Sequence, residues 1–277
     1  PPWQGDGAMP GCAGTIEPDI GDTEYWEAYY EEELADVDDR TGADAVFDWF
    51  FGWTEVRPII EPLTGLGLDG EVLHLGCGNS ALPEEMLDFG GYRRQTCVDI
   101  CRSVVQHMEA RNSLRPGLRW IAADCTDLTT VLPSDGFGLV IDKGAMDVFL
   151  ARDEHALAVA SFIKEAFRLT SPGGYYVSIN LASPERVLCW LRHKAFAWKV
   201  EVVPVSLKVV SADKECRAYV CSKQAVCEDS LCGWPALLER VRARPDSDLS
   251  SSESEEEDDA DDYEEGEEEE QGEDGKA

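Results

Sequence analysis

The sequence predicts an α/β fold: a doubly wound, Rossmann-like, mostly parallel sheet of seven strands with helices on both faces. Three observations predict it. Strand-like and helix-like runs alternate from residue 71 onward, a glycine turn joins the first strand to a helix, and acidic residues follow successive strands. Alternation of this kind produces a mostly parallel sheet. Because such sheets bind ligands at the carboxyl ends of their strands, we expect the site there, near the first strand.

The elements follow from hydrophobic periodicity and from turn residues. We predict strands near 71–75, 95–99, 118–123, 137–142, 174–180, 198–205 and 216–222, and helices near 81–89, 102–113, 153–169 and 184–195. Ser80 is the expected N-cap of the first of these helices. The run Ser171-Pro172-Gly173-Gly174 is expected to end the long helix and to lead into the next strand.

The turn Gly76-Cys77-Gly78-Asn79-Ser80 follows the apolar strand directly. Glycine allows the backbone to approach a ligand closely, so this turn favours a nucleotide-like ligand. The third glycine of the dinucleotide fingerprint is absent, because Ala81 stands there, and a phosphate loop would need Gly-Lys-Ser/Thr. An NAD-dependent dehydrogenase therefore fits the sheet but not the glycine spacing. An ordinary strand–turn–helix connection is the alternative.

Charged residues end three more strands. Asp99 suits two ribose hydroxyls or the cap of the next helix. Asp124 suits an exocyclic amine such as that of adenine, or again a cap. The run Asp142-Lys143-Gly144-Ala145-Met146-Asp147 follows the fourth strand, where active sites lie, although Lys143 and Asp147 also suit a surface salt bridge.

Aromatic residues are dense before the first strand, in Tyr25-Trp26-Glu27-Ala28-Tyr29-Tyr30 and in Phe47-Asp48-Trp49-Phe50-Phe51-Gly52-Trp53. One interpretation is a pair of helices that closes the sheet edge. The other is a lid over a ligand, and the two are compatible.

The net charge of −32 is distributed unevenly. Residues 246–277 hold eighteen acidic residues and one lysine, so this segment carries −17 and the other 245 residues carry −15. An acidic chain is not expected to bind nucleic acid, because phosphates require basic surface, whereas a basic protein partner is compatible. The ten cysteines lie largely in apolar runs, which is typical of reduced intracellular thiols, and we expect neither a metal site nor a membrane span.

The chain divides into a flexible arm (1–22), one folded domain (23–224), a connector (225–245) and an acidic tail (246–277) expected to be disordered. The tail is interpreted as solubilising, with phosphorylation of its serines as the alternative. We expect a monomer in the cytoplasm, with mitochondria as the alternative location if a leader precedes Pro1.

The glycine turn together with the strand-end acids resembles the seven-strand (class I) S-adenosylmethionine-dependent methyltransferases over roughly residues 24–223. The aromatic motifs and the run 142–147 are similar to the lysine methyltransferases that act on elongation factor 1-alpha and on citrate synthase. That resemblance implies S-adenosylmethionine as the cofactor and one of those two proteins as the substrate. The cofactor-binding candidates are Trp26, Tyr30, Trp49, Gly76, Gly78, Asp99, Ile100, Asp124, Cys125, Asp142 and Lys143.

Two positions depart from the family pattern: His74 stands where the wider class often has an acid, and Ala145-Met146 replaces the usual Thr-Leu. The chemistry agrees with the resemblance, since aromatic faces attract a sulfonium cation and methyl transfer needs alignment rather than a protein nucleophile. Asp147 is expected to orient the departing proton of a neutral lysine, and Asp147 and Lys143 are the catalytic candidates. A small-molecule methyltransferase and a degenerate binding module are the alternatives.

Overall fold

The computed structural model describes residues 23–35, 46–48, 52–63, 67–151, 156–205, 215–224, 237 and 239. Its seven strands are β1 (Glu71–Leu75), β2 (Arg94–Asp99), β3 (Leu118–Ala122), β4 (Phe137–Lys143), β5 (Thr170–Asn180), β6 (Trp198–Val205) and β7 (Cys216–Lys223). Its helices are α1 (Thr23–Ala35), α2 (Trp53–Ile60), α3 (Leu82–Asp88), α4 (Arg102–Arg111), α5 (Ala145–Leu150), α6 (Ala156–Leu169) and α7 (Pro184–Leu191).

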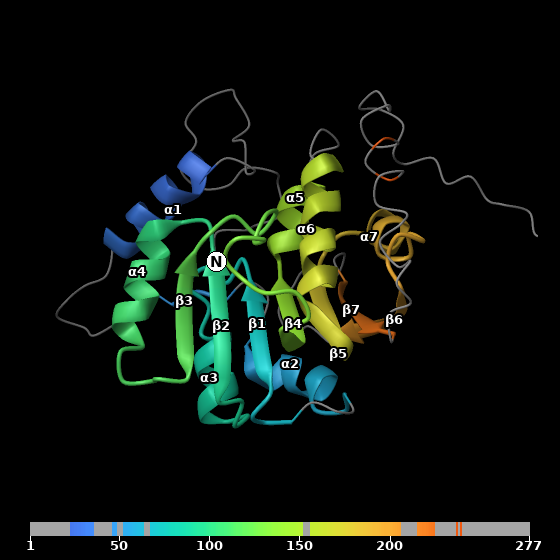
Figure 1. Cartoon of the computed structure of the whole chain (residues 1–277). Helices are drawn as coiled ribbons and strands as arrows, with labels where there is room; N and C mark the ends of the chain where they lie inside the picture. Colours follow the sequence, from blue (N-terminus) through green and yellow to red (C-terminus); the bar gives the residue numbers. More distant parts are fainter. Residues whose placement is uncertain are drawn as a thin grey trace, which may run out of the picture.

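The strands form one sheet in the order β3-β2-β1-β4-β5-β7-β6 (Figure 1). Strand β7 runs antiparallel to both of its neighbours, and the pairs from β3 to β5 are parallel. The predicted fold class is therefore confirmed. The carboxyl ends of β1, β2 and β4 lie side by side, and the order of the strands reverses between β1 and β4, where ligands bind in open α/β sheets.

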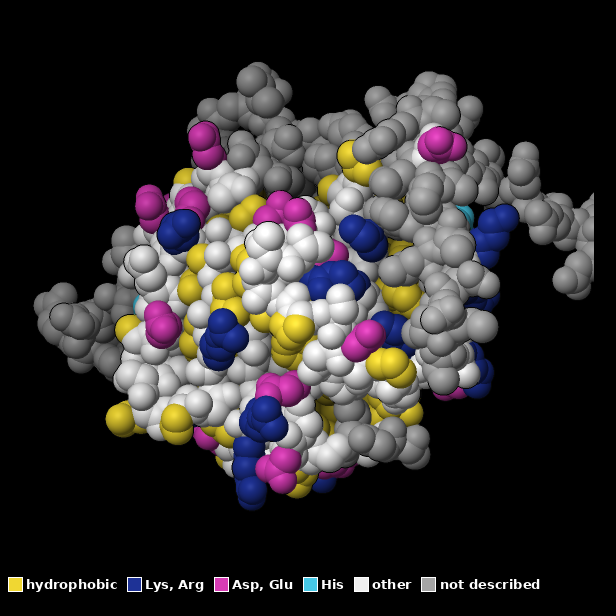
Figure 2. All heavy atoms as spheres, in the orientation of Figure 1, with side chains coloured by type: hydrophobic (Ala, Val, Ile, Leu, Met, Phe, Trp, Pro, Cys, Tyr) yellow, Lys and Arg dark blue, Asp and Glu magenta, His cyan; other side chains and the backbone are white. Residues whose placement is uncertain are grey.

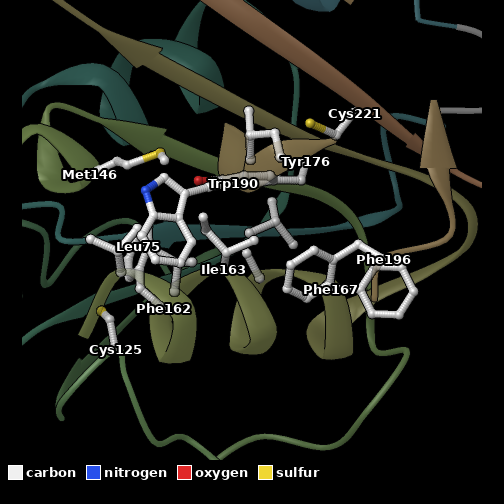
Figure 3. Packing of buried hydrophobic residues seen from close by; sticks show 14 of the residues in the cluster. Leu75, Cys125, Met146, Phe162, Ile163, Phe167, Tyr176, Trp190, Phe196 and Cys221 are labelled. Carbon is white, nitrogen blue, oxygen red and sulfur yellow. The ribbon is translucent and has the colours of Figure 1, made fainter. Parts of the chain in front are cut away.

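One face of the sheet is covered by α5, α6 and α7. Figure 3 shows Phe162, Ile163 and Phe167 of α6 directed toward Tyr176 of β5 and Trp190 of α7. These side chains belong to a single buried apolar cluster that also includes residues of β1, β2, β4 and β7. Burial of each such side chain stabilises the fold by about 1.5–3 kcal/mol relative to exposure. This face therefore forms a rigid support for the carboxyl edge of the sheet.

The other face is covered by α2, α3 and α4. Trp53, Val56 and Ile60 of α2 pack with Met86 of α3 against the sheet. Helix α1 packs along α4 beside the β2–β3 end of the sheet, where Tyr30 joins the cluster beneath α4 (Figure 1). The two helices of the aromatic region thus have different positions, since α2 covers a face whereas α1 lies beside the carboxyl edge.

Three features differ most from the prediction. Helix α5 was not predicted, because its first three residues belong to the charged run 142–147 and its six residues are too few for a periodic pattern. Strand β5 begins at Thr170 and therefore includes the predicted break, where Gly173 has a φ of +78° and the pairing with β4 shifts register. The N-cap position of α3 is held by Ala81 rather than by Ser80.

The expected arm, connector and tail lie outside the described residues, apart from Leu237 and Glu239. Figure 2 shows basic and acidic side chains interspersed on the described part of one face. Within the described residues, no helix is long and apolar enough to cross a membrane, and no group of three or more His, Cys, Asp or Glu side chains is placed to hold a metal ion.

Candidate active site

The glycine turn lies at the carboxyl end of β1, in the middle of the sheet. Gly76 and Gly78 have positive φ angles of +61° and +49°, a region that residues with a side chain rarely adopt. Space also requires glycine here, because a Cβ on Gly76 would lie 2.5 Å from Cβ of Ala145, and one on Gly78 would collide with the Tyr30 hydroxyl. The turn therefore contacts α5 on one side and α1 on the other.

Asp99 ends β2 beside this turn and is buried. Its Oδ2 accepts a hydrogen bond from the Gly78 N–H at 2.8 Å, and its Oδ1 accepts one from the Cys101 N–H at 3.1 Å. Burial raises the pKa of the Asp99 carboxyl. The side chain thus joins the glycine turn to the start of α4. The N-cap position of α4 itself belongs to Cys101.

The carboxylate that caps α4 comes from α1. Glu27 Oε1 accepts from the Arg102 N–H at 2.6 Å, and its Oε2 accepts from the hydroxyl and N–H of Ser103 at 2.6 and 3.3 Å. Although burial opposes the effect, the hydrogen bonds from Ser103 and Arg102 lower the pKa of Glu27. A negative charge is stabilised at a helix N-terminus, so this contact fixes α1 at the carboxyl edge.

Aromatic side chains of α1 lie against the same edge. Tyr30 is 5% exposed and its hydroxyl lies against Gly78. The ring centroid of Trp26 is 6.1 Å from that of Tyr30, and Ile100 packs against the same cluster. The structure therefore brings Trp26, Tyr30 and Ile100 together beside the glycine turn. Trp49 lies outside the described residues.

The loop after β3 reaches the turn from the other side. Asp124 Oδ1 accepts from the N–H and the hydroxyl of Thr126, both at 2.8 Å, so it closes a turn rather than capping a helix. The Cys125 thiol is buried, and burial raises its pKa, while the Gly76 N–H is directed toward its sulfur. Asp124 and Cys125 are thus both placed at the carboxyl edge.

Lys143 ends β4 and pairs with Asp48 of the amino-terminal region. Its Nζ lies 3.1 Å from Asp48 Oδ1, and its side chain is 6% exposed. Burial lowers the pKa of Lys143, while the charge of Asp48 acts in the opposite direction. The expected surface pair of Lys143 with Asp147 is wrong, because Asp48 is the ion-pair partner and Asp147 accepts from backbone amides.

Asp142 lies below the edge, in the core. Its Oδ2 accepts from the Ser178 hydroxyl at 2.7 Å and from the Tyr176 hydroxyl at 3.1 Å, and its Oδ1 accepts from the Met146 N–H at 3.0 Å. Burial raises the pKa of Asp142 to about 6. This fully buried carboxyl joins β4, β5 and the start of α5, so its structural contacts account for its place at the end of the strand.

Asp147 lies on the first turn of α5. Its carboxylate accepts from the Leu181 N–H at 3.0 Å and from the Ala182 N–H at 3.0 Å, and so holds the loop after β5. Burial raises the pKa of Asp147 to about 7, helped by the nearby charge of Asp142. A carboxyl of this pKa changes protonation near neutral pH, as a general base requires.

The prediction missed Asn180, the last residue of β5. Its Nδ2 donates to the Ser178 hydroxyl oxygen at 3.0 Å, and the Ser178 hydroxyl hydrogen is already donated to Asp142, which fixes the orientation of the amide. Within the described part of the chain, its Oδ1 is buried without a hydrogen-bond partner, as is the hydroxyl of Tyr219 on β7. Unpaired buried acceptors are rare in proteins and often mark functional positions. An amide at a strand end was the only signal in the sequence.

His74, which replaces the acid found in the wider class, is buried on β1. Its Nε2 lies 2.7 Å from Gln95 Oε1, and the Gln95 amide donates to the carbonyls of Pro83 and Tyr92. Burial lowers the pKa of His74 to about 4, so the imidazole is neutral at neutral pH and donates to Gln95. His74 therefore joins β1, β2 and α3 as a neutral packing residue.

These groups fit S-adenosylmethionine. The glycine turn leaves no room for a Cβ, Asp99 provides a carboxylate for ribose hydroxyls, and the rings of Trp26 and Tyr30 provide faces that attract a cation. Lys143 provides a cationic group that can recognise the carboxylate of the cofactor by charge. The residues that would hold the cofactor therefore come from the carboxyl ends of β1, β2 and β4, from the loop after β3 and from α1.

Comparisons with known proteins agree with this geometry. Residues 72–174 match the family model described as a methyltransferase domain. EEF1A lysine methyltransferase 4 from Mus musculus is 31% identical over 186 residues, which cover 64% of this chain and 68% of that protein. The eEF1A lysine and N-terminal methyltransferase from Danio rerio is 30% identical over 185 residues, which cover 66% of this chain but 25% of that protein, so the chain spans about a quarter of that relative's length.

Among solved structures, the N-methyltransferase NodS from Bradyrhizobium japonicum WM9 in complex with S-adenosyl-l-homocysteine has a TM-score of 0.51 and 18% identity, over 72% of this chain and 98% of that chain. This likeness shows the same fold. The fold and the site together define an S-adenosylmethionine-dependent methyltransferase with a seven-stranded sheet. The chain belongs to the methyltransferase family that includes EEF1A lysine methyltransferase 4 of Mus musculus.

Proposed function

We propose that this chain transfers a methyl group from S-adenosylmethionine to the side-chain amine of a lysine in a protein. The observation that carries the proposal is the meeting of two sets of groups at one sheet edge. The glycine turn and Asp99 form the cofactor half of the edge, and Asp147 and Asn180 form its acceptor half. The relatives are named EEF1A lysine methyltransferase 4 and eEF1A lysine and N-terminal methyltransferase, which supports a protein substrate and makes eEF1A the first one to test.

Bound S-adenosylmethionine supplies a methyl group on a sulfonium, so that the bond from nitrogen to the methyl carbon forms as the carbon–sulfur bond breaks and its electron pair stays on sulfur. The residues of the chain align the amine and exclude water. A neutral amine is required, and burial in an apolar channel lowers the pKa of a lysine. The proton released from nitrogen passes in this proposal to Asp147, whose pKa of about 7 suits that role.

Asn180 has a separate part in the proposal. Its Oδ1 is a buried acceptor, and a lysine amine carries N–H groups that need one. Since the amide orientation is fixed by the bond to Ser178, Oδ1 would hold one N–H and aim the lone pair of the amine in one direction. This is a role in orientation, and it requires no charge on Asn180.

The test is transfer of labelled methyl groups by the purified chain into recombinant eEF1A and into fractionated lysate, with mass spectrometry of the product. We expect label on a lysine side chain. Label that survives protease pretreatment of the lysate would support a small-molecule substrate instead. No label under any condition, with S-adenosylhomocysteine still bound, would support a binding module. The matched control is Gly78→Ala, which removes the space at the glycine turn.

A further inference from the structure

Asp48, in the amino-terminal region, contacts three groups at the carboxyl edge. Its Oδ1 accepts hydrogen bonds from the Ser80 hydroxyl and from Lys143 Nζ, the latter at 3.1 Å. Its Oδ2 lies 3.4 Å from the Ala81 N–H. The neighbouring Phe47 N–H donates to the Asn79 carbonyl at 3.3 Å. Residues 46–48 thus contact the end of the glycine turn, at Asn79 and Ser80, and the following Ala81.

The Asp48 carboxylate favours the charged form of Lys143. A buried ammonium is costly unless it is paired, and the Lys143 side chain is 6% exposed. Besides Asp48, the described groups that face it include Glu85 of α3, Cys216 of β7 and His74 of β1. His74 is neutral at neutral pH and burial raises the pKa of Cys216 to about 12, so neither changes charge between pH 6 and 9.

The position of Lys143 indicates which part of the cofactor it meets. It ends β4, next to β1, and β1 leads into the glycine turn. An ammonium binds anions and is repelled by cations, and the single negative group of S-adenosylmethionine is the carboxylate of its amino-acid part. An ammonium has three donors, so Lys143 can hold Asp48 and a second carboxylate at the same time.

We propose that Asp48 is a positioning residue: it holds the Lys143 ammonium charged and directed toward the carboxylate of the cofactor. This inference rests on the cofactor class and is independent of which substrate is methylated. A purely structural role, in which Asp48 fastens residues 46–48 through Ser80 and Ala81, is the competing explanation. The positioning role and the structural role differ in which ligands lose affinity when Asp48 is changed, and in how that loss depends on pH.

The experiment measures binding of two ligands by calorimetry to wild-type protein and to Asp48→Asn. S-adenosylhomocysteine carries the amino-acid carboxylate, whereas 5′-methylthioadenosine has the same nucleoside and thioether without it. The amide in Asp48→Asn has one oxygen, so it can still accept from Ser80 but not also from Ala81, and it removes the negative charge beside Lys143. We expect affinity for S-adenosylhomocysteine to fall about tenfold at about pH 8.5 and much less at about pH 6.5, because Lys143 then loses its proton more readily as the pH rises.

Affinity for 5′-methylthioadenosine is expected to stay the same in Asp48→Asn at both pH values, and this also shows that the variant is folded. In a Lys143→Met background, Asp48→Asn should cause no further loss of S-adenosylhomocysteine affinity. Ser80→Ala is the matched control, since it removes another partner of the same carboxylate and should not make binding depend on pH.

An equal loss of affinity for both ligands, or an equal loss of S-adenosylhomocysteine affinity at both pH values, would overturn the inference. Asp48 would then only hold residues 46–48 in place. Additive effects of Asp48→Asn and Lys143→Met would do the same. Wild-type protein that binds neither ligand would instead contradict the cofactor assignment itself. The failure of the inference and the failure of the proposed function are therefore distinguishable.

Discussion

The two halves of the carboxyl edge differ in how fully their buried polar groups are hydrogen-bonded. In the cofactor half, Asp99 and Glu27 accept from backbone amides of the turn after β1 and of the start of α4, so their lone pairs fix the backbone on which a ligand would rest. In the acceptor half, Asp147 also accepts from backbone amides, but burial raises its pKa to about 7, near neutral pH, and Asn180 keeps an acceptor that has no partner among the described residues. The cofactor half therefore fixes the backbone conformation. The acceptor half has a carboxyl that can take up a proton and an amide oxygen that can accept a hydrogen bond.

The largest expected effect comes from the cofactor half. Gly78→Ala places a Cβ against the Tyr30 hydroxyl at a positive φ, so we expect loss of S-adenosylhomocysteine affinity by about 100-fold or more, measured by calorimetry. Gly173→Ala is the matched control, because Gly173 also has a positive φ but open space around its Cβ position. It should cost about 1 kcal/mol of the free energy of unfolding and leave binding unchanged. Equal binding by both variants would contradict the assignment of the turn.

The next effect belongs to the acceptor half. Asp147→Asn keeps the shape of the side chain but removes the base, so we expect kcat for methyl transfer to fall about 100-fold while affinity for S-adenosylhomocysteine changes less than about twofold. Asp127→Asn controls for charge, since Asp127 closes an exposed turn through Thr129. Unchanged kcat, or a parallel loss of cofactor affinity, would remove Asp147 from its proposed role.

The raised pKa values also predict how stability depends on pH. Asp142 and Asp147 hold protons in the folded state up to about pH 6 and about pH 7, whereas an unfolded aspartate releases its proton near 3.8. Their contribution to stability is therefore present below pH 4 and is lost as the pH rises toward 7, by an amount on the order of 2 kcal/mol or more. Urea unfolding between pH 4.5 and 7.5 should show this fall, and Asp147→Asn should reduce it. An equal slope in the variant would contradict the assignment.

The smallest effect is expected at Asn180. Asn180→Leu removes the unpaired acceptor while keeping the volume, so we expect KM for the protein substrate to rise about tenfold with no loss of cofactor affinity. Tyr219→Phe removes the other unpaired group of this region and should change KM less. If steady-state kinetics show an unchanged KM for Asn180→Leu, the Asn180 amide and the Tyr219 hydroxyl have only structural roles in the core.

The cofactor half was largely predictable from the sequence because its signals are local. These signals are two glycines separated by one residue, followed by acids at the next strand ends. The alternation of strand and helix is enough to place all of them at one edge of the sheet. What could not be predicted is the way the amino-terminal region closes this edge. Glu27 caps a helix 75 residues away, and Asp48 pairs with a lysine 95 residues away, and no local pattern encodes such pairs.

The acceptor half was predictable only in part. The run 142–147 marked a functional region, but the six-residue helix that begins within it at Ala145 was too short for a periodic pattern. Asp142 was expected at the cofactor and instead lies in the core, because its partners on β5 come from the pairing of Asp142 with Ser178 across the sheet. Asn180 can be recognised as a candidate site residue only from the hydrogen-bond network of the folded chain.

A crystal structure of the chain with S-adenosylhomocysteine tests the division of the edge into two halves most directly. We predict ribose hydroxyls on Asp99, the amino-acid carboxylate within hydrogen-bond distance of Lys143, and the sulfur directed toward the side of the edge that holds Asp147 and Asn180. A ligand whose sulfur is directed away from that side, or whose ribose lies away from Asp99, would contradict the account.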